Sequence, residues 1–229
     1  MPNAILAVDC GTTGLKATLV SRDGRTLATS VSDYRNATAS APGGIVEQLP
    51  ADWWHAMQQA VAELLLRAEG DSIAAISLSG QMQDLIFVRN DGTVLGPAIL
   101  YSDSRATEEA AAIEAKMGKD RLCIETGNWK GPLSLLPKLL WCQKHRPEDL
   151  ASSDAILLGS HSFLALMLCG RAVGDRVTAS TTGLLRADGT NYCNDIINEV
   201  LPPGEMVLMR LPLDAGQSVK LSGREDEIR

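Results

Sequence analysis

The chain has 229 residues, a formal net charge of −7, and 45% hydrophobic against 21% charged residues. A chain of this length and composition can bury a substantial core. The acidic balance disfavours nucleic acid and anionic membrane surfaces as partners, and no apolar run approaches the roughly 18 residues of a membrane span. The five cysteines are scattered without a Cys-x-x-Cys pair. This favours reduced thiols in a cytoplasmic protein over a zinc site or a disulfide framework.

The first third of the sequence predicts a strand meander followed by a helix. Short β-rich runs, separated by a glycine loop and an Asp-Gly turn, indicate strands at residues 4–9, 15–21 and 25–31. Residues 37–44, rich in Ala, Ser, Pro and Gly, predict a loop. Apolar residues at helical spacing then predict a helix from Asp52, its expected N-cap, to Arg67, with Gly70 as the stop.

Helices and strands alternate along the rest of the chain. Further strands are expected at residues 73–79, 84–89, 93–101 and 155–158. Further helices are expected at residues 106–117, 133–145, 162–168 and 196–201. A meander followed by this alternation favours an α/β domain with a mixed sheet flanked by helices. The last stretch, residues 215–229, is polar without clear periodicity, which is compatible with disorder.

A glycine loop, Asp9-Cys10-Gly11-Thr12-Thr13-Gly14, joins the first two predicted strands. The two glycines allow a tight turn that brings backbone N–H groups near an anion, and the two threonines add hydroxyl donors. Asp9 could hold a hydrated Mg²⁺ beside a phosphate, and Lys16 could face the same site from the next strand. Taken alone, the segment fits a plain β-turn with a solvated Asp9 equally well.

An aspartate-led glycine loop between two hairpin strands resembles the loop of the actin, Hsp70 and sugar-kinase group of ATPases. Later segments, in the right order, resemble the FGGY family of carbohydrate kinases. These segments are Gly44-Ile45-Val46-Glu47-Gln48 with Trp53-Trp54, Ser79-Gly80-Gln81-Met82-Gln83-Asp84, residues 97–105 (PAILYSDSR), and Thr126-Gly127-Asn128 with residues 137–141 (PKLLW). The resemblance covers residues 4–190 and implies a ribonuclease-H-like domain.

The resemblance also implies ATP and Mg²⁺ as cofactors and a pentulose-like sugar or polyol as substrate. It places the metal, through water, at Asp9, and the phosphates at Gly11, Thr12, Thr13, Gly14 and Lys16. It places the sugar at Gln81, Met82, Gln83, Asp103 and Arg105. Amide and carboxylate groups suit this role because they exchange hydrogen bonds with hydroxyl groups. Gln83 stands where xylulokinases carry His, so xylulose itself is not fixed as the substrate.

Structural alternatives exist for several of these residues. Gln81 and Gln83 also fit surface loop positions, and Asp103 also fits a cap for the helix expected near Arg105. One of the adjacent Trp53 and Trp54 is expected in the core and the other at the border of a pocket. The histidines have no partner at catalytic spacing and are expected to be structural or exposed; they are His55, His145 and His161.

The catalytic base of the family is an Asp in a Gly-Gly-Gly-Asp-Asn type segment, and residues 1–229 contain no such segment. Asp175 follows a glycine but stands in a different context. The resemblance therefore implies an N-terminal lobe over residues 1–229 that lacks the C-terminal lobe, and we expect binding without turnover. A non-catalytic sugar-binding or regulatory module is the alternative, and a homodimer is one assembly left open.

Overall fold

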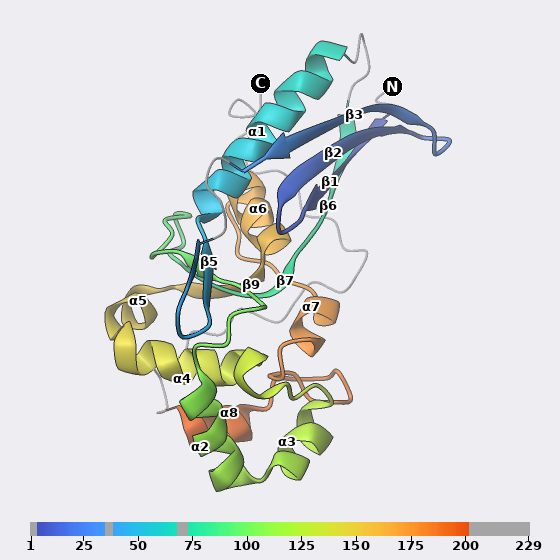
Figure 1. Cartoon of the computed structure of the whole chain (residues 1–229). Coiled ribbons are helices and arrows are strands. Elements are labelled where there is room, and N and C mark those ends of the chain that lie inside the picture. Colours follow the sequence, from blue (N-terminus) through green and yellow to red (C-terminus); the bar gives the residue numbers. More distant parts are fainter. Residues whose placement is uncertain (1–3, 35–38, 68–72, 202–229) are drawn as a thin grey trace.

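The computed structural model of the chain describes residues 4–34, 39–67 and 73–201, which form two β-sheets surrounded by helices (Figure 1). Among these residues, every helix is too short or too polar to span a bilayer. The predicted α/β class with a mixed sheet is confirmed. Gly70, the expected helix stop, and the tail at residues 215–229 lie outside the described residues.

The first sheet contains the predicted meander. It consists of β1 (Ala4–Cys10), β2 (Gly14–Ser21), β3 (Thr26–Asp33) and β6 (Ile73–Gly80), in the order β3-β2-β1-β6. The first three strands pair antiparallel, and β6 lies parallel to β1. Because β6 is parallel to β1, the carboxyl ends of both strands reach the same edge of the sheet.

The second sheet is antiparallel and includes elements that the sequence did not predict. It consists of β4 (Ala39–Ala41), β5 (Ile45–Gln48), β8 (Ala98–Ile99), β7 (Met82–Val88) and β9 (Ala155–Gly159). The loop expected at residues 37–44 contains β4, which forms a hairpin with β5. The strand expected at 93–101 shrinks to Ala98–Ile99, because Gly96 adopts a φ of +92° and Pro97 cannot donate to a ladder.

The helices agree with the prediction except for three short ones. They are α1 (Pro50–Arg67), α2 (Thr107–Met117), α3 (Lys119–Thr126), α4 (Leu135–His145), α5 (Pro147–Ser152), α6 (Ser160–Cys169), α7 (Arg176–Ser180) and α8 (Asn194–Val200). The short α3, α5 and α7 were not predicted. The first helix begins at Pro50 rather than after an Asp52 cap, because proline fits the first helical turn, where its missing N–H is not needed.

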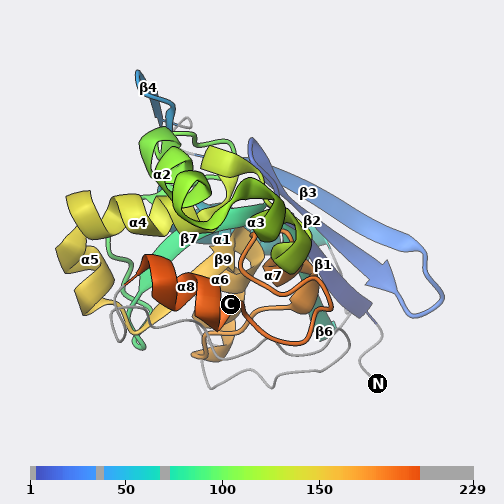
Figure 2. The same cartoon turned by 90° about the horizontal axis from the view of Figure 1, so that it is seen from below.

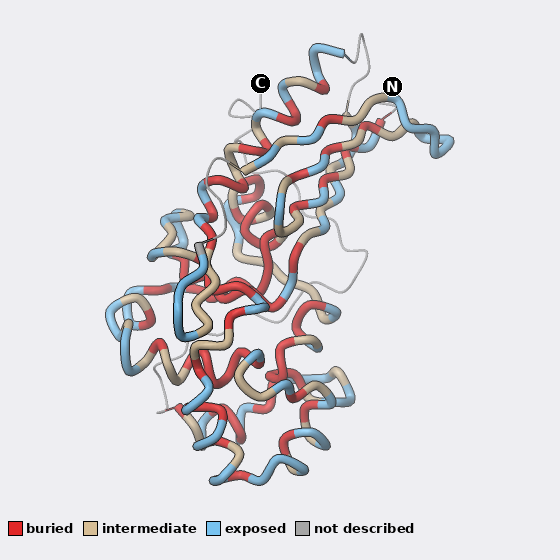
Figure 3. The backbone as a smooth tube through the Cα atoms, viewed as in Figure 1, coloured by how far each residue is buried: buried red, intermediate tan, exposed pale blue. Residues whose placement is uncertain are grey.

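Two hydrophobic cores lie on the two faces of the second sheet. Its strands β7 and β9 are almost entirely buried (Figure 3). Successive side chains of β7 alternate between them: Ile86 faces the core under α1 and α6, whereas Leu85 and Phe87 face the core under α2 and α4. This explains why the strand reads as a continuous apolar run. Figure 1 shows α2, α3 and α8 at the bottom of the molecule and the β1–β3 meander at the top, and Figure 2, seen from below, looks onto these helices.

The adjacent tryptophans divide as expected only in part. Trp53 is fully buried and packs edge-to-face against Phe163 of α6, with ring centroids 6.1 Å apart. Trp54 is half-buried and packs against the edge of the same core. The core role of one tryptophan is therefore confirmed.

Candidate functional site

The candidate site lies where β1 and β6 end, beside the start of α6. Cys10 and Gly80 are register partners at the ends of the two parallel strands. The backbone N–H of Gln81 and the hydroxyl of Ser160 both donate to the Cys10 carbonyl, at 3.0 and 2.7 Å. A Cβ at Gly80 would lie 2.3 Å from the Ser160 hydroxyl and 2.6 Å from the Cys10 carbonyl. Glycine is thus required at position 80 for the predicted phosphate and sugar loops to meet.

Carbonyl oxygens of the glycine loop point into the protein. Besides the Cys10 carbonyl, the Gly11 carbonyl accepts from Tyr34 Oη at 2.5 Å and the Thr12 carbonyl accepts from Gln48 Nε2 at 2.6 Å. The described peptide bonds are all trans, so the N–H following each carbonyl points the opposite way.

The outward N–H groups of Thr12 and Thr13 have no acceptor among the described residues, whereas the N–H of Gly11 donates to the Gly14 carbonyl at 3.1 Å. The loop therefore presents backbone donors on its outer side. This is the arrangement of a backbone anion site.

Asp9 and Lys16 lie on one face of the first sheet. They are direct partners in the antiparallel β1–β2 ladder, and both are exposed. Asp9 Oδ1 accepts from Ser79 Oγ of the neighbouring β6 at 2.9 Å, which leaves the rest of the carboxylate open to solvent. Among the residues that the structure covers, no cluster of three or more acidic, histidine or cysteine side chains could hold a metal by itself.

A buried amide network joins the two loops, and we refer to Gln48, Trp53 and Gln81 as the amide cluster. Gln48 Oε1 accepts from Trp53 Nε1 at 3.0 Å and from Gln81 Nε2 at 2.9 Å. Gln81 Oε1 is buried without a partner. The sequence did not single out Gln48. It lies 36 residues from Thr12 and 33 from Gln81, so no local pattern connects these residues. Its segment was noted only because it resembles the family.

The remaining residues of the predicted sugar loop differ in exposure. Met82 is 37% exposed. Gln83 is buried and has a φ of +67°, the single positive value for a non-glycine residue in the described ranges. Its side-chain amide donates to the carbonyl of Thr181, beyond α7. A left-handed glutamine held by a distant contact marks a locally constrained backbone, which is common at functional sites.

Asp103 and Arg105 contact each other, and Arg105 also contacts Glu47. We refer to these three residues as the ionic cluster. The Asp103 carboxylate is fully buried and accepts from the Val46 N–H at 2.6 Å and from Arg105 Nη2 at 2.7 Å. Arg105 Nη2 also pairs with Glu47 at 2.8 Å. The expected helix cap is wrong, since α2 begins at Thr107 and its N-cap residue makes no side-chain capping bond.

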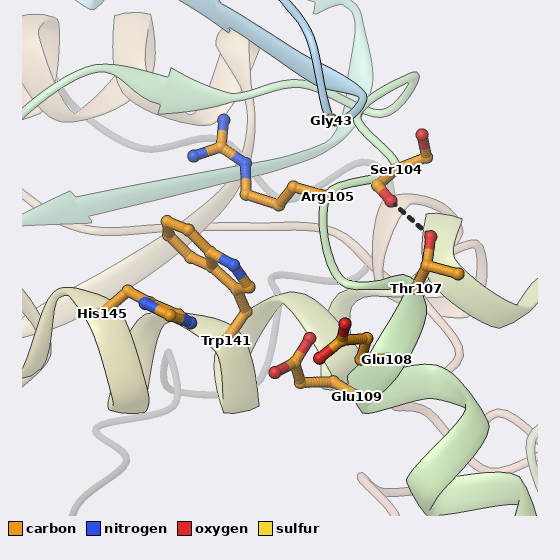
Figure 4. A pocket seen from close by; sticks show the side chains of 8 residues that line it. All are labelled: Gly43, Ser104, Arg105, Thr107, Glu108, Glu109, Trp141 and His145. Carbon is orange, nitrogen blue, oxygen red and sulfur yellow. Dashed lines mark hydrogen bonds between the residues drawn. The ribbon is translucent and has the colours of Figure 1, made fainter.

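The ionic cluster borders a pocket of about 420 Å³ (Figure 4). Its lining residues are Gly43, Ser104, Arg105, Thr107, Glu108, Glu109, Trp141 and His145. The Arg105 guanidinium lies 4.9 Å from the Trp141 ring centroid, and the His145 ring stacks on Trp141 at 4.5 Å. Of the predicted site residues, Arg105 alone lines this pocket.

One histidine has a partner that the sequence did not reveal. His161 Nε2 lies 3.1 Å from Asp175 Oδ2 and 3.2 Å from Thr178 Oγ1. The hydrogen bond from His161 is the main reason why the pKa of Asp175 is held well below its ordinary value. Asp175 also caps α7 by accepting from the Thr178 N–H at 2.8 Å. The expectation that His161 has no such partner is therefore wrong; the pair joins α6 to α7.

A buried acid and a buried lysine behind the sugar loop were also missed. Asp84 is buried, and desolvation raises the pKa of its carboxyl well above the ordinary value. Lys138 is buried, donates to the Leu100 carbonyl at 2.7 Å, and has its pKa lowered by desolvation to about 8. Asp84 accepts no hydrogen bond of normal geometry. The nearby backbones of Tyr101 and Ser160 lower its pKa, but less than desolvation raises it. Each of these charged residues is followed by apolar residues, Asp84 by Leu85 and Lys138 by Leu139. That pattern could have indicated buried charges.

Comparison with known proteins matches residues 4–211 to the N-terminal domain of the FGGY family of carbohydrate kinases. The chain is 32% identical to the xylulose kinase of Escherichia coli K12 over 178 residues, which cover 77% of this chain but 36% of that protein. Two solved structures from Lactobacillus acidophilus, a ligand-bound xylulose kinase and a gluconate kinase, each superpose with a TM-score of 0.86 at 22% identity, covering 98% of this chain and 45% of theirs. The chain thus spans less than half the length of these proteins.

Proposed function

Because the chain belongs to the FGGY family of carbohydrate kinases and has the ribonuclease-H-like fold of its structural neighbours, we propose that it is the sugar- and phosphate-binding lobe of an ATP-dependent kinase. The substrate class is a pentulose-like sugar or polyol with a hydroxyl group to be phosphorylated. The observation that carries the proposal is the meeting of two loops at one strand edge: one presents backbone N–H donors and the other presents amide side chains.

The phosphate side of the proposed site is the glycine loop with Asp9 and Lys16. Backbone donors at Thr12 and Thr13 suit phosphate oxygens, and Lys16 adds a positive charge on the same face as Asp9. A single open carboxylate fits a hydrated Mg²⁺, which keeps several waters and takes one or two carboxylates. When bound, the ion would neutralise charge on the transferred phosphoryl group. The chain's own residues would hold and orient the phosphates.

The sugar side is the loop from Gln81 to Gln83. Gln81 Oε1 is an acceptor for a hydroxyl group, and the exposed Met82 offers an apolar surface to the carbon face of a sugar. Gln83 fixes the loop through Thr181. We place Asp103 and Arg105 behind this surface, where Asp103 holds the Val46 N–H two residues before Gln48. Their proposed effect on the sugar is through the position of β5.

Turnover requires a base to orient the attacking hydroxyl and a second lobe to complete the nucleotide site. We assign neither to this chain, and the proposed partner is the C-terminal lobe of the same kind of kinase. The chain alone should therefore release no ADP from ATP in the presence of D-xylulose. Release at an ordinary kinase rate of roughly 1–100 s⁻¹ would contradict this assignment.

Binding of the two ligands tests the proposed function directly. D-Xylulose and MgATP titrated separately into the chain should each bind at millimolar affinity, about −4 kcal/mol, because a half-site open to water gains only a few net contacts. Asp9→Asn should weaken MgATP and leave D-xylulose unchanged. Asp120→Asn, exposed in the first turn of α3, is the matched control and should change neither. Failure of both ligands to bind, or equal loss in both variants, would overturn the proposal.

A further inference from the structure

Gln48 hydrogen-bonds to both loops of the proposed site through its side-chain amide. It lies at the end of β5, is 6% exposed, and bonds to the Thr12 carbonyl on one side and to the Gln81 amide on the other. An amide side chain has one acceptor end and one donor end, so its orientation determines in which direction such a chain of hydrogen bonds runs.

Trp53 fixes that orientation. The indole N–H can only donate, and it lies 3.0 Å from Gln48 Oε1. The atom of Gln48 that faces Trp53 is therefore the oxygen, and the nitrogen faces the Thr12 carbonyl. The same oxygen faces Gln81, so Gln81 must present its nitrogen to Gln48 and turn its own oxygen away. This leaves Gln81 Oε1 as a buried acceptor without a partner.

The result is a one-way relay from the sugar loop to the phosphate loop. A hydroxyl that donates to Gln81 Oε1 polarises the amide, which strengthens the bond from Gln81 Nε2 to Gln48 and then the bond from Gln48 Nε2 to the Thr12 carbonyl. The Thr12 carbonyl belongs to the same trans peptide as the Thr13 N–H. Holding the carbonyl inward aims that N–H outward, toward an anion.

A second link between the loops does not serve this purpose. The Gln81 N–H donates to the Cys10 carbonyl, whose peptide carries the Gly11 N–H. That N–H donates to the Gly14 carbonyl at 3.1 Å and is not available to an anion. The route through Gln48 is thus the one that ends on a free backbone donor.

We propose that Gln48 is a positioning residue that couples sugar binding at Gln81 to phosphate binding at Thr12 and Thr13. The inference rests on the proposed function and deepens it, because it predicts that the two ligands bind cooperatively even in this lobe alone. Saturating D-xylulose should raise the affinity for MgATP by about fivefold or more, the lower end of couplings between sites. By linkage, MgATP should raise the affinity for D-xylulose by the same factor.

Two substitutions at Gln48 test the relay in different ways. Gln48→Met removes every link. Gln48→Glu keeps the acceptor for Trp53 and Gln81 but has no donor for the Thr12 carbonyl at neutral pH. In both variants the coupling factor should fall to about 1 while each ligand alone still binds. Gln59→Met is the matched control, because Gln59 is exposed on α1 and its side-chain oxygen accepts from Ser32 Oγ; it should keep the full coupling.

The readout is the amide spectrum of the ¹⁵N-labelled chain, which a purely structural role of Gln48 would not alter in this pattern. In the wild type, D-xylulose should shift the amides of residues 80–84 and also those of Thr12 and Thr13. In the two Gln48 variants the second group should stay in place. If one variant does not fold, the other carries the comparison, and the wild-type coupling is a test that needs neither. Wild-type binding of both ligands without cooperativity, or full cooperativity in Gln48→Met, would overturn the inference while leaving the proposed function intact; absence of binding would remove both.

Discussion

Two buried polar clusters lie on opposite faces of β5 and are built in opposite ways. Neighbouring side chains of a strand point to opposite faces, so Glu47 enters the ionic cluster with Asp103 and Arg105, and Gln48 enters the amide cluster with Trp53 and Gln81. In the ionic cluster, charges of opposite sign pair with each other. In the amide cluster, one buried acceptor, Gln81 Oε1, remains without a protein partner.

This difference separates a structural role from a binding role. The Asp103 carboxylate already accepts from the Val46 N–H and from Arg105, so a ligand hydroxyl would have to displace one of these donors. Gln81 Oε1 has no partner to displace. Since an unsatisfied buried acceptor is unfavourable by about 1–3 kcal/mol, a ligand that satisfies it gains that amount back. Substitutions in the ionic cluster should therefore act mainly on stability, and substitutions in the amide cluster mainly on binding.

The largest expected effect is on the ionic cluster. Asp103→Ala leaves Arg105 buried beside a single remaining acid, Glu47, and removes the acceptor of the Val46 N–H. We expect the free energy of unfolding in urea to fall by about 3–5 kcal/mol, as for other broken buried ion pairs. Asp23→Ala, which breaks an exposed pair with Arg25, is the control and should have little measurable effect. A stable Asp103→Ala variant that no longer binds D-xylulose would instead assign Asp103 to the ligand.

Lys138→Met should have the next largest effect, and one that depends on pH. It removes the cation nearest to buried Asp84, and we expect a loss of about 3 kcal/mol at pH 8. Because the pKa of Asp84 is raised in the folded protein, the protein loses stability as pH rises through that pKa. Without Lys138, which lowers this pKa, the loss should be larger. In the wild type, the lowered pKa of Lys138, about 8, means that stability present at high pH is lost as pH falls through 8.

On acidification, protonation of Asp84 favours the variant and protonation of Lys138 disfavours the wild type. The difference in unfolding free energy between wild type and Lys138→Met should therefore shrink from pH 8 to pH 5. Denaturation curves at the two pH values measure it. A difference that stays constant or grows on acidification would show that Asp84 and Lys138 are not coupled.

The amide cluster should respond in binding more than in stability. Gln81→Leu removes the bond to Gln48 but also removes the unsatisfied oxygen, so we expect the unfolding free energy to change by no more than about 1 kcal/mol. Binding of D-xylulose should weaken about fivefold, the value of one hydrogen bond. Titrations of wild type and variant under the same conditions measure this. Unchanged sugar affinity would remove Gln81 from the site.

The smallest effect is expected at Tyr34. Tyr34→Phe deletes the hydroxyl that holds the Gly11 carbonyl inward and should lower the unfolding free energy by about 0.5–1.5 kcal/mol. MgATP should bind more weakly because the glycine loop is less firmly held, whereas D-xylulose should bind as before. Equal weakening of both ligands would indicate a general loosening of the lobe.

The sequence predicted the parts of the site that local pattern controls. The meander and its glycine loop follow from short β-rich runs and from Gly11 and Gly14, and the Gln81 loop follows from the end of a predicted strand. Short helices such as α7 were missed because five residues are too few for a helical period to show. What could not be predicted is how side chains pair across the fold. Gln48 meets Thr12 and Gln81 only when the end of β5 reaches the glycine loop. Asp103 receives the Val46 N–H only because the β4–β5 hairpin reaches it, and Glu47 of the same hairpin pairs with Arg105.

The most direct test of the contrast between the two clusters is a map of amide shifts as D-xylulose is added to the wild-type chain. The account predicts shifts that centre on residues 80–84 and extend to Thr12 and Thr13, with the Trp141 indole N–H and residues 104–109 unchanged. Shifts that centre on the pocket beside Arg105, with residues 80–84 unchanged, would contradict it and would place the sugar at the ionic cluster.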